Sequence, residues 1–323
     1  MTSSLKSQNM KFELTVVVPV YNVENYLLRS IESLGSWLNN KAIEILIVDD
    51  GSTDDSLLVA RHIEETYNNV SVYHKDNGGL SSARNFGHSL AGGRYVYFFD
   101  SDDALSEDAA KILLKTILST SDDLIMFGYD EILEDGTINT FTNKIKSQEM
   151  ELILEKDDIL TELLGMKQGF VPGYAPTKIF RSDAIKELSF REMYYEDLPF
   201  FMDFLRQNAS DTYRFINLPL YKYYRRSGSI TLQSSETKLM DKMTSLDIML
   251  DAVLEMSSNP RIVNEAFKSY FVGYLWIAKL NKDVSSVLVS KRVHKALHSN
   301  QGKYFELFKG FKNFVKFVYY RTF

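Results

Sequence analysis

The feature that most constrains the fold of this chain is an alternation of short apolar runs with helical patterns over residues 11–130. The runs at residues 14–18, 43–48, 70–74 and 95–99 are rich in β-branched or aromatic residues, and apolar residues recur at helical spacing between them. Continuous apolar strands separated by helices are typical of a parallel sheet covered on both faces. The sequence therefore predicts an α/β fold, with a mostly parallel sheet flanked by helices.

Two changes of pattern divide the rest of the chain. Residues 122–143 suggest short strands, and beyond residue 235 apolar residues keep helical spacing throughout. No repeat or low-complexity tract interrupts this order. The predicted parts are a flexible N-terminus at residues 1–11, an α/β domain at residues 12–234 and an all-helical C-terminal region at residues 235–323.

Composition and charge exclude several classes of protein. The 323 residues include no cysteine, which excludes a disulfide framework, a thiolate zinc site and a cysteine nucleophile. The net charge of −6 argues against nonspecific nucleic-acid binding. Residues 1–10 lack the apolar core of a signal peptide, and no apolar run approaches the roughly 20 residues that cross a bilayer. We therefore expect a cytoplasmic protein without a nucleic-acid partner.

Polar loops follow the first two predicted strands, at the ends where open parallel sheets bind ligands. In the first loop, Pro19 and Tyr21 are placed to lay a ring beside a nucleotide base, whereas Asn22 is explained fully as a helix cap. In the second loop, the carboxylates of Asp49 and Asp50 are suited to accept from a base N–H or a ribose hydroxyl. The alternative for the second loop is a cluster that caps the next helix. We expect both roles there, with one of the two acids facing the ligand.

The most acidic loop follows the apolar run at residues 95–99. Asp100, Asp102 and Asp103 fall close together, and such carboxylates repel one another unless a cation or a proton relieves them. Oxygen ligands of this kind suit Mg²⁺ or Mn²⁺. In an extended segment Asp100 and Asp102 project to the same side. The sequence therefore favours a divalent-metal site over a simple helix cap.

A glycine-rich loop and the start of a helix occupy residues 77–85. Gly78 and Gly79 let the backbone approach a ligand, and the helix that follows can receive phosphate or ribose oxygens at its N-terminus. The loop lacks the Gly-Lys-Ser/Thr ending of a Walker loop, and it lacks G-x-G-x-x-G as well. These absences argue against a P-loop enzyme and weaken a dinucleotide-binding interpretation.

Two motifs farther along also suggest chemistry. Glu196 and Asp197 stand between aromatic residues, where a carboxylate is suited to act as a general base. The alternative is the N-terminus of a helix with Pro199 in its first turn. Residues 224–231 form a basic loop that can hold a diphosphate, although by itself it is no more specific than an exposed basic turn.

The C-terminal tail differs in charge from the rest of the chain. Residues 291–323 carry eight basic side chains and one acidic side chain. Over residues 303–319, phenylalanine and valine recur at helical intervals with lysines between them. A basic amphipathic helix of this kind can make a peripheral contact with an anionic membrane. It can equally pack against the other C-terminal helices or form a homo-oligomer interface, and these alternatives stay open.

Five motifs in order resemble glycosyltransferase family 2, whose members have the GT-A fold: VVVPVYN, VDDGSTD, NGGLSSARN, FFDSDD and YYEDLPFF. The resemblance covers residues 12–232. It implies an inverting transfer of a sugar from a nucleotide-diphospho-sugar, most often a UDP-sugar, to a hydroxyl of an acceptor. For relatives of this kind the acceptor is a bacterial surface polysaccharide or a glycoprotein glycan, on a lipid or a protein carrier. The Gln-x-x-Arg-Trp element of processive synthases is absent, which favours single additions.

The resemblance also implies which residues bind the donor. Three would line the nucleobase pocket, with the acid accepting from a uracil N–H: Pro19, Tyr21 and Asp50. Asp49 belongs to the same acidic pair. Three more would border the nucleotide along the glycine-rich loop: Gly79, Arg84 and Asn85.

The remaining implied roles concern the metal, the diphosphate and the proton. Asp100 and Asp102 match the DxD element that binds Mn²⁺ or Mg²⁺ and the ribose, and Asp103 is a neighbouring third acid. Asp197 matches the general base, with Glu196 in support. Arg226 and Ser229 fall where related enzymes close a loop over the diphosphate.

Two rival functions remain to be weighed against an enzyme of this family. One is a non-catalytic sugar-nucleotide-binding protein or scaffold with the same fold, and the presence of every acid that the mechanism requires argues against it. The other is a nucleotidyltransferase, which would need a basic glycine-rich loop at its N-terminus. VVVPVYN does not supply such a loop.

Overall fold

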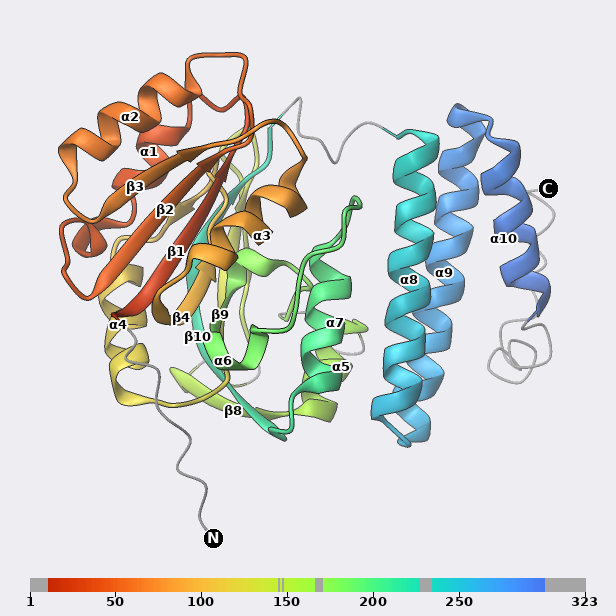
Figure 1. Ribbon diagram of the computed structural model, residues 1–323. Helices are drawn as coiled ribbons and strands as arrows, with labels where there is room; N and C mark the ends of the chain where they lie inside the picture. Colours follow the sequence, from red (N-terminus) through yellow and green to blue (C-terminus); the bar gives the residue numbers. More distant parts are fainter. Residues whose placement is uncertain (1–10, 145, 147, 166–170, 227–233, 300–323) are drawn as a thin grey trace, which may run out of the picture. The chain divides into compact units, whose positions relative to one another are not determined.

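The structure of the protein is a computed structural model, which describes residues 11–144, 146, 148–165, 171–226 and 234–299 (Figure 1). The chain divides into two compact units. The first unit consists of residues 1–156, 170–192 and 208–226. The second consists of residues 157–169, 193–207 and 227–323.

One ten-stranded sheet forms the framework of the first unit. Its strands are β1 (Phe12–Val20), β2 (Ile43–Asp49), β3 (Val70–His74), β4 (Gly93–Phe98), β5 (Ala104–Leu105), β6 (Leu124–Ile132), β7 (Ile138–Phe141), β8 (Glu151–Glu155), β9 (Lys178–Arg181) and β10 (Thr212–Tyr224). Their order is β3-β2-β1-β4-β9-β6-β10-β5, with β7 paired to β6 and β8 to β10. Strands β3, β2, β1 and β4 are mutually parallel, as predicted, and β9 then introduces antiparallel pairing, so the whole sheet is mixed.

Helices cover both faces of the parallel part of this sheet. They are α1 (Leu27–Glu32), α2 (Ser56–Thr66), α3 (Leu80–Leu90) and α4 (Ala109–Ser119), with the shorter α6 (Ser182–Ile185), η1 (Gly35–Trp37) and η2 (Ala175–Thr177). Successive side chains of a strand point to opposite faces. Val16 and Val18 of β1 accordingly enter the core that contains apolar residues of α1, α2 and α4. Val17 points the other way and meets α3 at Gly87.

The contact between β1 and α3 requires glycine at position 87. A Cβ atom there would lie 2.3 Å from Cγ1 of Val17, far inside van der Waals contact. Because overpacking of this kind costs roughly 1–3 kcal/mol, we expect Gly87→Ala to lower the free energy of unfolding in urea by about that amount. Adding Val17→Ala to Gly87→Ala should recover part of the loss, since it removes the clashing methyl groups. Equal stability of Gly87→Ala and the unmodified protein would contradict this packing.

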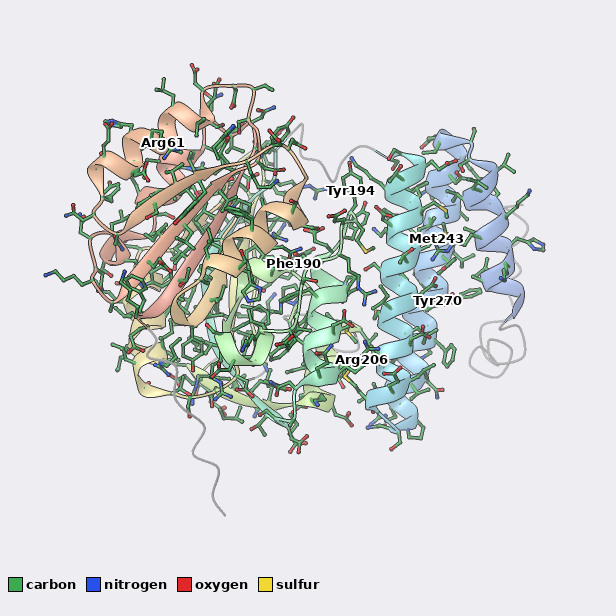
Figure 2. All side chains as sticks on the ribbon, viewed as in Figure 1. Arg61, Phe190, Tyr194, Arg206, Met243 and Tyr270 are labelled. Atoms are coloured by element: carbon green, nitrogen blue, oxygen red, sulfur yellow. The ribbon has the colours of Figure 1, made fainter. Side chains whose placement is uncertain are left out.

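The second unit is helical over its described residues. It contains most of α5 (Lys156–Leu163), together with α7 (Asp197–Gln207), α8 (Glu236–Met256), α9 (Pro260–Val284) and α10 (Val287–Ser299). The side chains of Ser235 and Asn259 cap α8 and α9 by accepting from backbone N–H groups. Met243 of α8 and Tyr270 of α9 belong to the buried apolar stripes that the sequence predicts, and both are labelled in Figure 2. The predicted helical C-terminal region is therefore confirmed for these helices.

The division into units differs from the predicted boundary at residue 234. Residues 157–169 and 193–207 also belong to the second unit. Helix α7 packs against α8, and the hydroxyls of Ser257 and Ser269 donate to Asp157 and to the carbonyl of Leu164. Chain order alone does not reveal this packing. The basic tail at residues 303–319 lies outside the described residues, and none of the described helices is both long and apolar enough to cross a membrane.

Candidate functional site

The polar loops predicted to bind a ligand gather at one edge of the sheet in the first unit. Strands β1, β2, β3 and β4 are parallel, so their carboxyl ends, Val20, Asp49, His74 and Phe98, lie at the same edge. Open α/β sheets bind their ligands at this edge. The structure therefore brings the VYN, DDGSTD, glycine-rich and FDSDD loops together.

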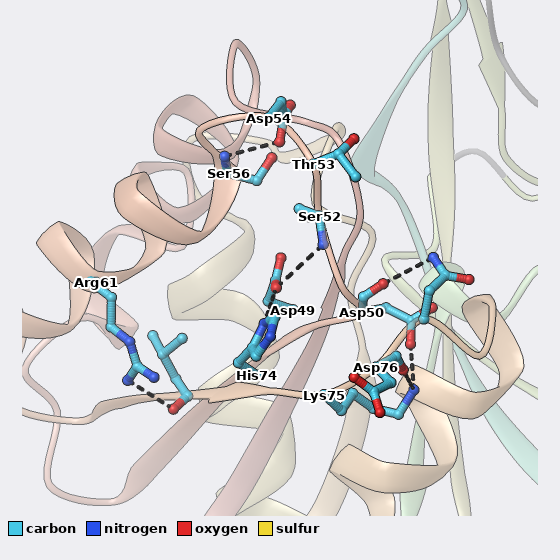
Figure 3. Close-up of polar contacts among 12 residues, drawn as sticks. Asp49, Asp50, Ser52, Thr53, Asp54, Ser56, Arg61, His74, Lys75 and Asp76 are labelled. Atoms are coloured by element: carbon cyan, nitrogen blue, oxygen red, sulfur yellow. Dashed lines mark hydrogen bonds and ion pairs between the residues drawn. The ribbon is translucent and has the colours of Figure 1, made fainter.

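The carboxylate of Asp50 organises the glycine-rich loop. Its oxygens accept from the backbone N–H groups of Gly78 at 3.0 and 3.2 Å and of Gly79 at 2.7 Å. Nζ of Lys75 lies 2.5 Å from Oδ1 of Asp50 (Figure 3). The side chain is only 3% exposed. These contacts fix the turn that precedes α3. The contact of Asp50 with a uracil N–H stays a prediction.

Asp49, the other acid of this pair, points inward. It is fully buried, and its Oδ2 lies 2.6 Å from Nδ1 of His74 and accepts from the N–H of Ser52 at 3.4 Å (Figure 3). The end of β2 lies beside β3, so His74 closes in this carboxylate. The role of Asp49 in nucleotide binding stays a prediction.

In the VYN loop, Tyr21 and Asn22 are exposed, whereas Val20 is buried. Tyr21 is 46% exposed at the end of β1, where a base can reach it, whereas Pro19 is buried within β1 opposite Val48. Asn22 does not cap a helix, since α1 begins at Leu27. Its side chain accepts from the N–H of Thr53 at 2.8 Å and so ties the first loop to the second.

Two residues at the start of α3 that are predicted to contact the nucleotide also have partners within the protein. Arg84 is 1% exposed, donates to Oδ1 of Asp100 at 2.8 Å and lies 5.1 Å from the ring centroid of Phe190. Asn85 exchanges two hydrogen bonds of 2.8 Å with the backbone of Phe190. Gly79, which precedes α3 with φ of +85°, keeps open space around its Cα. Of the three predicted residues, only Gly79 leaves room for a ligand.

Asp103 anchors the acidic loop to β10. Its carboxylate accepts hydrogen bonds from the hydroxyl of Tyr221 and from the N–H of Tyr224, the latter at 2.8 Å. The residue is 2% exposed. Burial, with the charges of Asp102 and Asp100, raises the pKa of Asp103 well above its usual value. The predicted set of three metal ligands is corrected accordingly, because no group of three acidic or histidine side chains placed for one ion occurs among the described residues.

Asp100 and Asp102 fit a metal site of the kind that uses few protein ligands. Their side chains are each 29% exposed, with Asp100 paired to Arg84 and Asp102 paired to Arg226. Mg²⁺ is commonly bound through one or two carboxylates, with waters and substrate phosphates completing its coordination. These two carboxylates are therefore suited to hold a divalent ion together with a diphosphate.

Two arginines lie beside this acidic loop, and only one of them, Arg226, belongs to a predicted motif. Arg29 of α1 donates to the carbonyl of Asp102 at 2.7 Å, and its guanidinium lies 4.0 Å from the ring centroid of Tyr224. Arg226 lies 4.4 Å from the ring centroid of Tyr26. Two guanidinium groups held by aromatic rings suit the recognition of phosphate. No motif marks Arg29, and its only signal is its place in the helix after the first strand.

The acids predicted to move the proton lie in the second unit. Asp197 is the first residue of α7, with Pro199 in the first turn, so the local prediction of a helix N-terminus is confirmed. Glu196 is 6% exposed, and its carbonyl accepts from the N–H of Phe200 at 3.1 Å. Ser229 lies outside the described residues.

The comparison with protein families decides the class of the protein. The sequence model described as "Glycosyl transferase family 2" matches residues 15–188. The chain belongs to glycosyltransferase family 2. The match contains the four loops at the edge of the sheet but ends before Asp197 and the C-terminal helices.

Relatives and solved structures agree with this assignment. Glycosyltransferase GlyA of Streptococcus pneumoniae is 31% identical over 225 residues, which are 68% of this chain and 31% of GlyA. The minor teichoic acid biosynthesis protein GgaB of Bacillus subtilis is 28% identical over 58% of this chain and 20% of GgaB. The chain thus matches less than a third of the length of either relative.

Among solved structures, residues 1–349 of TarS from S. aureus, in complex with UDP-GlcNAc, resemble this family 2 chain with a TM-score of 0.65. The two are 20% identical, and the likeness covers 93% of this chain and 92% of that one. At this identity the likeness concerns the fold alone. It confirms the predicted GT-A type of fold together with its helical C-terminal region.

Proposed function

We propose that this glycosyltransferase moves a sugar from a nucleotide-diphospho-sugar to a hydroxyl of an acceptor glycan, with inversion at the anomeric carbon. The observation that carries the proposal is the pair Asp100 and Asp102 beside the guanidinium groups of Arg29 and Arg226, at the ligand-binding edge of the sheet. A UDP-sugar is the first candidate donor, because TarS was solved with UDP-GlcNAc. GgaB is a teichoic acid biosynthesis protein, which supports a bacterial surface glycan as the acceptor.

On the donor side, each element of the edge has a distinct task. Asp100 and Asp102 would hold Mn²⁺ or Mg²⁺, which supplies positive charge beside the departing diphosphate. Arg29 and Arg226 can pair with phosphate oxygens through their forked N–H groups. Asp50 keeps the glycine-rich loop in the shape that lets a nucleotide approach the start of α3.

On the acceptor side, Asp197 acts as the general base, with Glu196 supporting it. The acceptor oxygen attacks the anomeric carbon, the bond from that carbon to the diphosphate oxygen breaks, and the hydroxyl proton passes to the carboxylate of Asp197. A single displacement of this kind inverts the anomeric centre.

The proposal extends to the carrier of the acceptor and the place of the reaction. We place the enzyme in the cytoplasm, where its acceptor glycan is attached to a lipid or a protein. Residues 303–319 would then contact the inner face of the membrane or join the C-terminal helices of a homo-oligomer. The alternative of a non-catalytic protein that binds sugar nucleotides predicts donor binding without turnover.

A donor panel without acceptor tests the proposal directly. With Mn²⁺ present, we expect calorimetry to detect UDP binding and UDP-release assays to show that one UDP-sugar is hydrolysed fastest, because water can replace the acceptor hydroxyl. Chelation with EDTA is the control, and it should abolish hydrolysis and strongly weaken UDP binding. Binding without hydrolysis of any donor would favour the non-catalytic alternative. Absence of binding to UDP, GDP and dTDP would contradict the proposed function.

A further inference from the structure

The turn that precedes the two acids of the second unit has an uncommon backbone conformation. Tyr195 has φ of +61°, in the left-handed region that bulky side chains rarely adopt. Such a conformation persists only where the surrounding structure holds it, and it is frequent at functional sites. Asp197 follows two residues later, so the direction in which α7 starts depends on this turn.

Helix α8 holds the backbone on both sides of the strained residue. Oδ2 of Asp241 accepts from the N–H of Tyr194 at 3.0 Å, and the hydroxyl of Ser245 donates to the carbonyl of Tyr195 at 3.4 Å. Asp241 and Ser245 are one helical turn apart and therefore share a face of α8. The two contacts fix the peptide group that precedes Tyr194 and the peptide group that follows Tyr195, one on each side of the left-handed residue.

The side chains of the turn are held as well. Nζ of Lys242 lies 4.9 Å from the ring centroid of Tyr195 and 3.9 Å from that of Trp276 on α9. Burial lowers the pKa of this lysine, and cation–π contacts strengthen as the cation loses water. Lys238, one turn earlier on α8, lies 5.3 Å from the ring centroid of Tyr194. Lys242 therefore links the ring of Tyr195 to both α8 and α9.

We infer that α8 positions the general base of this enzyme, with Asp241, Lys242 and Ser245 acting as positioning residues for Asp197. The inference rests on the proposed function, since it takes Asp197 as the base. Helix α8 lies outside the segment matched by the family model, which ends at residue 188. Helix α8 thus contributes to catalysis in addition to its packing role.

Asp241 variants test the backbone contact. Because small displacements of a reacting group cost up to about 10²-fold in rate, Asp241→Ala should lower kcat for Mn²⁺-dependent donor hydrolysis by about 10- to 100-fold. The donor KM and the UDP affinity should stay unchanged, because the donor residues lie in the first unit. Asp241→Asn keeps an oxygen that can accept from Tyr194 and should restore most of kcat. Asp251→Ala is the matched control, an exposed aspartate on the same helix, and should behave as the unmodified enzyme.

Tyr195 variants test the strain independently of Asp241. Tyr195→Ala removes the ring that Lys242 holds yet keeps a side chain that disfavours positive φ, whereas Tyr195→Gly adopts positive φ freely. Tyr195→Gly should therefore retain more kcat than Tyr195→Ala. Equal loss in both variants would overturn the role of the left-handed conformation. Calorimetric UDP binding and thermal melting of each variant show that it is folded.

Asp197→Asn, measured in parallel, separates failure of this inference from failure of the proposed function. If Asp197→Asn loses activity while the Asp241 and Tyr195 variants keep normal kcat, the base assignment stands and the positioning role of α8 is refuted. If Asp197→Asn is fully active, the base assignment fails and the inference fails with it. Loss of kcat in both Asp197→Asn and Asp241→Ala, with rescue by Asp241→Asn, supports the base assignment and the positioning role of α8.

Discussion

Asp197→Asn is expected to lower the rate of sugar transfer, and of donor hydrolysis, by about 10²–10⁴-fold, the usual contribution of a general base. The amide has nearly the same size as the carboxylate but cannot take up the proton of the attacking hydroxyl. Because the described residues assigned to the donor belong to the first unit, UDP affinity and donor KM should stay close to those of the unmodified enzyme. Steady-state kinetics with the preferred donor and calorimetry with UDP measure the two effects separately.

The matched control for this substitution is Asp203→Asn, which makes the same chemical change farther along α7. Asp203 is 8% exposed and pairs with Arg206 at 3.0 Å, so its loss should affect stability and leave kcat largely intact. Normal turnover of Asp197→Asn would exclude Asp197 as the base. A large fall in UDP affinity would instead show that the substitution disturbs donor binding.

Asp102→Ala is expected to remove the dependence of donor binding on Mn²⁺. Even residues that only support metal ligands contribute about 10- to 100-fold in metal affinity, so loss of a direct carboxylate ligand should weaken Mn²⁺-dependent UDP binding by at least about 100-fold. The ion pair between Asp102 and Arg226 is lost as well, which frees the guanidinium for the diphosphate. Metal-independent UDP binding should therefore persist. Calorimetric titration with UDP in the presence of Mn²⁺ measures the metal-dependent affinity. The same titration in the presence of EDTA measures the metal-independent affinity.

Two other acids nearby serve as controls for Asp102. Asp108→Ala removes an exposed carboxylate at the start of α4 and should leave metal dependence unchanged. Asp103→Asn weakens the contacts with Tyr221 and Tyr224. It should therefore lower thermal stability more than it changes the dependence of UDP binding on Mn²⁺. An Asp102→Ala variant that keeps full metal dependence would remove Asp102 from the metal site.

The sequence by itself was sufficient for the architecture of the first 100 residues and for the helices beyond residue 235. Both patterns are local, because side chains repeat every two residues in a strand and about every 3.6 in a helix. The same argument locates the carboxyl ends of the strands and so the edge where the ligand binds. A motif such as FDSDD could therefore be assigned to that edge from its place directly after an apolar strand.

Only the tertiary structure decided what each polar side chain does at that edge. Asp49 is closed in by His74 and Asp103 by Tyr221, and these partners lie 25 and 118 residues away along the chain. Asp100 and Asp102 stay partly exposed although they stand in the same run of acids. Spacing in the sequence identifies a cluster of carboxylates, but burial and the direction of each depend on distant elements.

The same reason explains the residues that no motif revealed. Arg29 reaches the acidic loop across 73 residues of sequence, and Asp241 reaches Tyr194 across 47. Neither belongs to a short motif, since each acts through contacts with residues that are distant along the chain. The sequence determined the fold and the kind of chemistry. Long-range packing decided which carboxylates remain open to a ligand and which helix holds the turn before Asp197.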